Sequence, residues 1–127
     1  MTTLASKIIK IEEKLREFEK QIPGLEALAL VSADGLMLAS ALPSGVSEDK
    51  IAAMSAALYS ISERINEELE RGNFEMGLVI GDNGFTCVVG VNSETLLVAL
   101  TSKGTKLGLV LYEMKRIANF LRKEISE

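Results

Sequence analysis

Histidine and tryptophan are absent from the sequence, and cysteine occurs once, at Cys87. Without histidine, the chain lacks the commonest acid–base group near neutral pH and the commonest zinc ligand. A lone cysteine cannot form an intramolecular disulfide, so nothing indicates an oxidising compartment. No apolar window reaches the roughly 18 residues of a membrane-spanning helix, and the N-terminus has no signal-peptide pattern. We therefore expect a cytoplasmic protein with no cofactor, no metal site and no membrane insertion.

Positive charge and aromatic residues are also scarce. The net charge is -4, the isoelectric point is near 5.0, and the lysines and arginines are scattered among acidic residues. Because nucleic-acid binding needs clustered basic residues, we exclude that class of partner. Aromatic residues make up 5% of the chain against 47% hydrophobic residues, which predicts a core of aliphatic side chains and alanine. A length of 127 residues predicts one domain over residues 1–127.

Apolar periodicity predicts three helices and five strands. Apolar residues spaced three and four apart over Leu4–Ile22 are typical of an amphipathic helix, which Pro23-Gly24 would end. Asp34-Gly35 and Asn83-Gly84 are hairpin-turn signals, and Ser47 is a good helix N-cap. The order α-β-β-α-β-β-β-α is expected as a helix over Leu4–Ile22, strands over Leu25–Ser32 and Leu36–Ala41, a helix from Ser47 to about Arg71, strands over Phe74–Asp82, Phe85–Asn92 and Thr95–Thr101, and a helix over roughly Lys106–Glu124.

The residues that could carry catalysis have more ordinary structural explanations. Cys87 alternates with apolar residues on one strand face and has no basic neighbour in sequence, which favours a buried, inert thiol. The pairs Glu12-Glu13 and Glu67-Glu68 fall on solvated helix faces among basic residues. Lys103-Gly104-Thr105-Lys106 lacks the first glycine of a phosphate-binding loop, and a strand-to-helix turn capped by Thr105 explains it better. We therefore predict no catalytic residue.

Small residues, in contrast, are concentrated in two places. The strand over Phe74–Asp82 would place Glu75, Gly77, Val79 and Gly81 on a bare face and Phe74, Met76, Leu78 and Ile80 on a bulky one. The helix after Ser47 has an apolar stripe flanked by a run of alanine and serine, which would fit closely against that bare face. Contact within one chain and contact between two copies explain this pattern equally well. The strand over Thr95–Thr101 is apolar on both faces and is expected at the centre of the sheet.

Taken together, several segments resemble the roadblock domain. They are the first hairpin "LEALALVSADGLMLAS", the small-residue helix "EDKIAAMSAALYSISERINEEL", the strand pair "FEMGLVIGDNGFTCVVGV" and the closing "TLLVALTSKGTKLGLVLYEMKRIANFL". The resemblance extends from Leu4 to about Arg122. Roadblock domains form dynein light chains of the roadblock type, Ragulator subunits and the bacterial MglB-type partner of a Ras-like GTPase. The implied fold is α/β (α+β), with helices packed on a five-stranded, mostly antiparallel sheet.

The resemblance also implies a dimer, either of two identical chains or with a roadblock paralogue. The third strands would pair edge to edge to continue the sheet, and the second helices would lie side by side. Such a dimer would be a non-catalytic platform that binds a small Ras-like GTPase and modulates its cycle or localisation, or that scaffolds a complex. The implied dimer or core residues are Met54, Ala57, Leu58, Ile61, Ile65, Met76, Leu78 and Ile80, and the implied partner-binding residues on the outer face of the second helix are Glu63, Arg64, Glu67 and Arg71.

Three alternatives stay open. Arg64 or Arg71 could act as an arginine finger, although a salt bridge on the helix surface explains them better. A small-molecule-sensing module of the PAS or profilin type would need a roomy cavity lined by residues such as Thr86, Asn92 or Thr101. The first helix could pack on its own sheet or reach a partner, because an amphipathic stripe suits both.

Overall fold

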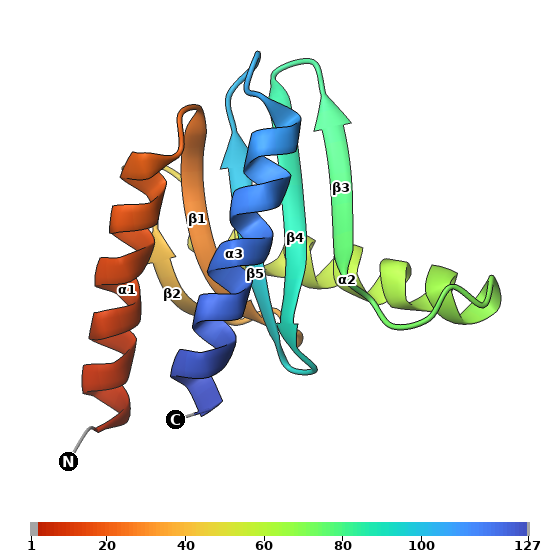
Figure 1. The fold of residues 1–127 in the computed structure, drawn as a ribbon, viewed down its shortest axis with the longest axis horizontal. Helices are drawn as coiled ribbons and strands as arrows, with labels where there is room; N and C mark the ends of the chain where they lie inside the picture. Colours follow the sequence, from red (N-terminus) through yellow and green to blue (C-terminus); the bar gives the residue numbers. More distant parts are fainter. Residues whose placement is uncertain (1–2, 127) are drawn as a thin grey trace.

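The computed structural model describes residues 3–126, and these fold into one antiparallel sheet with helices on both faces (Figure 1). The elements follow the predicted order. They are α1 (Leu4–Gln21), β1 (Leu25–Ser32), β2 (Met37–Ala41), α2 (Glu48–Glu68), β3 (Met76–Gly81), β4 (Gly84–Asn92), β5 (Thr95–Thr101) and α3 (Leu107–Ser126). None of the helices in the described range is long and apolar enough to cross a membrane.

The strands lie in the order β2-β1-β5-β4-β3, and every neighbouring pair is antiparallel. The last strand in sequence, β5, is therefore the central strand of the sheet, as its two apolar faces predict. The hairpins β1-β2 and β3-β4 lie on opposite sides of β5, which leaves β2 and β3 as the two edges of the sheet. In Figure 1, α1 and α3 lie in front of the sheet and α2 lies behind it.

Local sequence signals fix where the elements begin and end. The Ser47 hydroxyl accepts a hydrogen bond from the Lys50 amide at 3.2 Å, so it caps α2 as predicted. In the first hairpin, Gly35 has a φ of +95° and its amide donates to the Ser32 carbonyl at 3.0 Å. This is the left-handed conformation that glycine adopts readily and that tight turns require.

Two hydrophobic clusters fill the space on the two sides of the sheet. The larger cluster joins the sheet to α1 and α3 through residues such as Leu15, Leu28 and Met114, which are fully buried. The smaller cluster joins the sheet to α2 through Val31 and Val98. The periodicity of two along β4 and β5 supplies apolar residues to both clusters, as a covered central sheet requires.

The helix α1 packs on its own chain, which settles the question that its amphipathic stripe left open. Phe18 of α1 meets Phe120 of α3 edge to face, with ring centroids 5.7 Å apart. Lys14 lies over the Phe120 ring and Arg116 over the Phe18 ring, at 5.7 and 5.5 Å from the centroids. The buried face of α1 covers β1 and β2.

The structure corrects the predicted bounds around the second half of α2. The helix ends at Glu68 rather than near Arg71, because Glu70 adopts a positive φ of 54° and the Arg71 amide donates to the Asn66 carbonyl at 2.7 Å. The third strand begins at Met76 rather than Phe74. Phe74 consequently faces α2 instead of sharing a face with Met76, and its ring lies against Tyr59 with centroids 5.0 Å apart.

Two turns also differ in detail from the prediction. Gly81 pairs with Gly84 across the second hairpin, so Asp82 and Asn83 form the turn and Gly84 is the first residue of β4. The Thr105 hydroxyl donates to the Ser102 carbonyl at 2.7 Å and closes the turn before α3, whereas a capping role had been expected. The turn signals in the sequence therefore located the β3-β4 turn and the turn before α3 to within one or two residues.

Candidate functional site

The helix α2 has two faces of opposite character, and its small residues face the sheet. Its buried residues are Ala52, Ser55 and Tyr59. A Cβ added at Gly35 would lie 3.7 Å from the Ala56 Cβ, and one at Gly77 would lie 3.3 Å from both Leu58 and the Ser62 hydroxyl. The bare face of β3 and the small-residue flank of α2 therefore meet within one chain. Packing within one chain therefore explains the small residues of α2 and the glycine of β3.

The apolar stripe of α2 points away from the sheet. Met54, Ile61, Ile65 and Leu69 are 63, 61, 48 and 62% exposed. Ala57 beside them is also exposed, whereas Leu58 is half-buried against the sheet. A helix normally buries its apolar stripe, so α2 presents to solvent the side that would ordinarily form a core.

The edge strand β3 continues this apolar surface. Leu78, Val79 and Ile80 are 36, 53 and 66% exposed, and nothing in residues 3–126 pairs with the outer edge of β3. Register places Met76, Leu78 and Ile80 on the face that carries α3 and places Val79 on the face that carries α2. Met76 is half-buried against the core, so only the later part of the strand is open. The predicted interface residues of β3 therefore lie on the α3 face of the sheet, whereas those of α2 lie on the opposite face.

The helix α2 and the strand β3 also frame an open space. The C-terminal half of α2 extends past β3, beyond the edge of its own sheet (Figure 1). A groove of about 480 Å³ lies between the N-terminal half of α2 and strands β3, β4 and β5. Its walls are mostly apolar and include Met54, Leu58, Val79 and Leu100, with Thr86 at one side.

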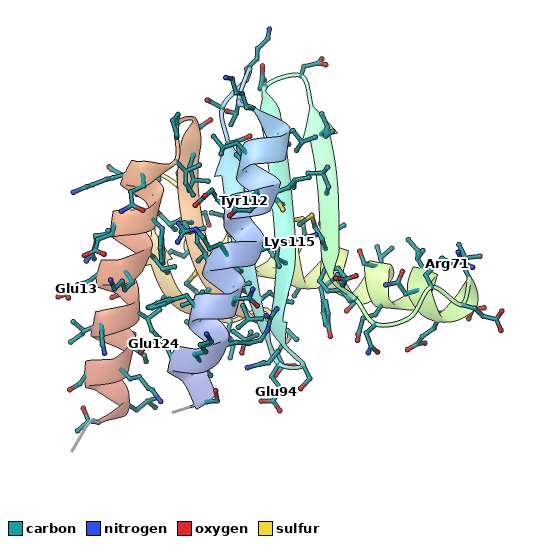
Figure 2. The ribbon with its side chains drawn as sticks, viewed as in Figure 1. Glu13, Arg71, Glu94, Tyr112, Lys115 and Glu124 are labelled. Carbon is teal, nitrogen blue, oxygen red and sulfur yellow. The ribbon has the colours of Figure 1, made fainter. Side chains whose placement is uncertain are left out.

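The four predicted partner-binding residues lie in three different settings. Arg64 pairs with Glu68 at 3.3 Å, and both side chains are largely exposed, as expected for a salt bridge on a helix surface. Glu63 and Glu67 lie on another side of α2, and the Glu63 carboxylate accepts a hydrogen bond from the Tyr59 hydroxyl at 2.8 Å. Arg71 does not lie on the helix as predicted, since it follows the end of α2 and its Nε donates to the Leu69 carbonyl at 2.9 Å (Figure 2).

Glu63 and Glu67 line a pocket of about 440 Å³ that sequence reasoning did not find. The pocket is formed by the C-terminal half of α2, the segment after it, the end of β4 and Arg122 of α3. Burial and then the hydrogen bond to Glu63 raise the pKa of Tyr59 above its ordinary value. Arg122 stands 55 residues from Glu67 in sequence, and no local pattern connects them. Asn92, which was a candidate cavity residue, is part of the wall.

Cys87 is inaccessible, which agrees with the prediction that it is a core residue. Its side chain is fully buried in the cluster between the sheet and α3, and burial raises the pKa of its thiol to about 11. A thiol with such a pKa is almost entirely protonated at neutral pH, and the thiolate is the nucleophilic form. In residues 3–126 no group of three or more Cys, Asp or Glu side chains is placed to hold a metal ion.

Comparison with known proteins identifies a domain family and several solved structures with the same fold. The model of the Roadblock/LC7 domain matches residues 10–101. An uncharacterized protein of Methanocaldococcus jannaschii is 34% identical over 112 residues, which cover 88% of this chain and 96% of that protein. The structure of Myxococcus xanthus MglB has a TM-score of 0.84 at 20% identity, covering 92% of this chain and 95% of the other. A structure titled MglB with tetrameric arrangement gives a TM-score of 0.86 at 20% identity and covers 98% and 93%.

The profilin fold is a more distant likeness. Profilin II of Acanthamoeba castellanii has a TM-score of 0.65 at 12% identity, covering 89% of this chain and 97% of profilin. The structural likeness to MglB is therefore greater than the likeness to profilin, the rival architecture considered for this sequence.

Proposed function

Because the chain belongs to the Roadblock/LC7 domain family, we propose that it is a non-catalytic, dimeric regulatory platform that binds a small Ras-like GTPase. The observation that carries this proposal is the outward apolar stripe of α2 beside the unpaired edge of β3. Burying apolar surface stabilises an association by about 25 cal/mol per Å² before the costs of association are subtracted. An edge strand with open backbone groups also favours pairing with another strand.

In the proposed dimer, the β3 strands of two copies pair antiparallel about a two-fold axis. Such a pairing joins two five-stranded sheets into one and satisfies the free backbone groups of both edges. It would also bring the overhanging half of each α2 alongside α2 of the other copy. The stripe residues Ile61, Ile65 and Leu69 would then reach the groove of about 480 Å³ in the second copy.

Light scattering of the purified protein over a range of concentrations tests the dimer. We expect a dimer for the natural sequence and a monomer for Ile61→Glu, since the substitution places a charge in the buried interface. The Ile61 side chain is 61% exposed in one chain, so the variant should keep its circular dichroism spectrum. Tyr112→Glu is the matched control, because Tyr112 is 66% exposed on α3, away from α2 and β3 (Figure 2). A dimeric Ile61→Glu variant would contradict the proposed interface.

The GTPase part of the proposal rests on family membership and on the exposed charges of α2. Arg64 is the candidate contact beside the apolar stripe, and Glu67 is the candidate on the other side of the helix. Charge reversal at Arg64 or Glu67 should weaken binding to a GTP-loaded Ras-like GTPase from the same organism without changing the dimer. Binding measured by calorimetry with GTP- and GDP-loaded partners checks this, and two variants that bind normally would place the GTPase elsewhere.

A further inference from the structure

The pocket between α2 and α3 has charged walls of opposite sign that do not pair with each other. Glu63 and Glu67 are one turn apart on the α2 wall, and the Arg122 guanidinium forms part of the other wall. Within residues 3–126, no basic nitrogen lies within 4.0 Å of either carboxylate. Carboxylates four residues apart on a helix repel each other by about 0.2–0.5 kcal/mol. A cation between them would remove that repulsion.

The guanidinium of Arg122 is fixed in place by the backbone of β4. Its Nε donates to the Val91 carbonyl at 2.5 Å, one Nη donates to the Gly90 carbonyl at 3.0 Å, and the other donates to the Asn119 side chain. Both carbonyls lie where the regular pairing of β4 ends, because β3 begins only at Met76, opposite Val89, and the register with β5 shifts between Gly90 and Asn92. A guanidinium has five N–H donors, so two are left for a ligand in the pocket.

On the α2 wall, a hydrogen bond holds Glu63 in place. The Tyr59 hydroxyl donates to one oxygen of the Glu63 carboxylate at 2.8 Å, which leaves the other oxygen as an acceptor. Tyr59 and Phe74 pack edge to face and form an aromatic side of the pocket, and Phe74 lies over Gly90, where an added Cβ would be 3.4 Å from the Phe74 ring. The aromatic side gives the aliphatic stem of a ligand something to pack against.

From this geometry we propose that the pocket binds a basic amino-acid group, with its side-chain cation between Glu63 and Glu67 and its carboxylate on the free N–H groups of Arg122. Two carboxylates at one wall and one guanidinium at the other match, in sign, the side-chain cation and the carboxylate of a basic amino acid. A volume of about 440 Å³ holds a ligand of this size. The source is either a free basic amino acid or the basic C-terminal residue of a peptide, since both have a side-chain cation and a carboxylate.

The pocket would stay open in the proposed dimer. Glu63 and Glu67 each lie two residues from a member of the apolar stripe, Ile61 or Ile65, and two residues turn about 200° around a helix. The carboxylates therefore lie on the opposite side of α2 from the proposed interface. Binding of the ligand needs neither the dimer nor a GTPase. The experiment below can therefore fail while the proposed function holds, and it can succeed even if the proposed function is wrong.

Isothermal titration of the full chain with L-arginine and L-lysine at physiological salt tests the site. We expect saturable binding of one ligand per chain, and about tenfold weaker binding for Glu67→Gln, which removes one charged hydrogen bond. Glu68→Gln is the matched control, because Glu68 is the next residue and pairs with Arg64 outside the pocket. Equal losses in the two variants would show nonspecific attraction to an acidic surface and would overturn the proposal, as would no binding of any of these ligands.

Ligand analogues test the second contact and the source of the ligand. Argininamide lacks the carboxylate, so it should bind about tenfold more weakly than L-arginine. Equal affinity would refute the role of Arg122 without any substitution of that structural residue. An acylated peptide ending in arginine that binds more tightly than L-arginine would identify a protein C-terminus as the source, and the reverse order would identify the free amino acid. Amide shifts of Asn73 and Ser93 in NMR spectra would locate either ligand at this pocket.

Discussion

Gly84 illustrates how a single residue can decide whether two strands pair. A Cβ at this position would lie 2.0 Å from the Thr101 carbonyl oxygen of β5, and the φ of +139° is one that other residues rarely adopt. Next to it, the Thr101 hydroxyl accepts from the Phe85 amide at 3.1 Å, which satisfies a buried polar group. The second hairpin and the central strand therefore fit together only because the side chain at position 84 is absent.

We expect Gly84→Ala to destabilise the fold by about 3 kcal/mol or more, since backbone strain of about 1–3 kcal/mol adds to a backbone clash. Chemical denaturation monitored by circular dichroism measures the loss. Gly45→Ala is the control, because Gly45 also has a positive φ of 89° but has no atom within 4 Å of the added Cβ. The control should lose only about 1–2 kcal/mol. Equal losses in the two variants would mean that the contact with Thr101 is relieved at little cost.

Burial of Cys87 predicts a dependence of stability on alkaline pH. Its thiol pKa is raised from 9.0 to about 11 in the folded chain, so the folded state binds its proton more tightly than the unfolded state. The resulting stabilisation is complete below pH 9 and is lost as the pH rises through 11, by about 3 kcal/mol in all. Urea denaturation at pH 8 and at pH 10.5 should show a steeper loss for the natural sequence than for Cys87→Ala. Parallel losses would show that Cys87 does not contribute.

At the scale of one element, α2 marks the limit of what its own sequence could predict. Its position, its N-cap and its two stripes were all predictable, because periodicity and Ser47 act locally. Its orientation was predicted in part, since the small-residue flank was expected against the sheet, but contact within one chain and contact between two copies explained that flank equally well. Tertiary fit decides between them, because Gly35 and Gly77 bring the sheet close to the small residues of α2 in the same chain. The pocket at Glu63 and Arg122 was missed because strand order, rather than sequence distance, brings its walls together.

Two neighbouring alanines of α2 test this orientation. Ala52 is 1% exposed, so Ala52→Leu should overpack the contact with the sheet and cost about 1–3 kcal/mol. Ala53 is exposed on the next residue, and Ala53→Leu should change the stability by less than about 0.5 kcal/mol. The free energy of unfolding in urea checks both variants. A larger loss at Ala53 than at Ala52 would mean that α2 is rotated relative to this structure.

At the scale of the whole molecule, the two edges of the sheet differ in protection. The β2 edge is guarded by side chains, since the Ser40 amide donates to the Glu12 carboxylate at 3.4 Å and the Ser40 hydroxyl donates to Glu48 at 3.3 Å. The β3 edge has no comparable guard among residues 3–126 and carries exposed Val79 and Ile80. Natural sheets normally block an exposed edge. Growth of the sheet is therefore favoured at β3 alone, which gives a closed pair rather than a filament.

A closed pair couples folding to association, so thermal stability should depend on protein concentration. We expect the midpoint of unfolding to rise by about 3 °C for each tenfold increase in concentration, because a dimer that dissociates on unfolding is stabilised by mass action. Differential scanning calorimetry from micromolar to near-millimolar protein measures this slope. Ile61→Glu should remove the slope and lower the midpoint, whereas Tyr112→Glu, on α3, should leave the slope unchanged. A midpoint that is independent of concentration in the natural sequence would contradict the dimer of identical chains, and the apolar stripe of α2 and the edge of β3 would then be covered by a different protein.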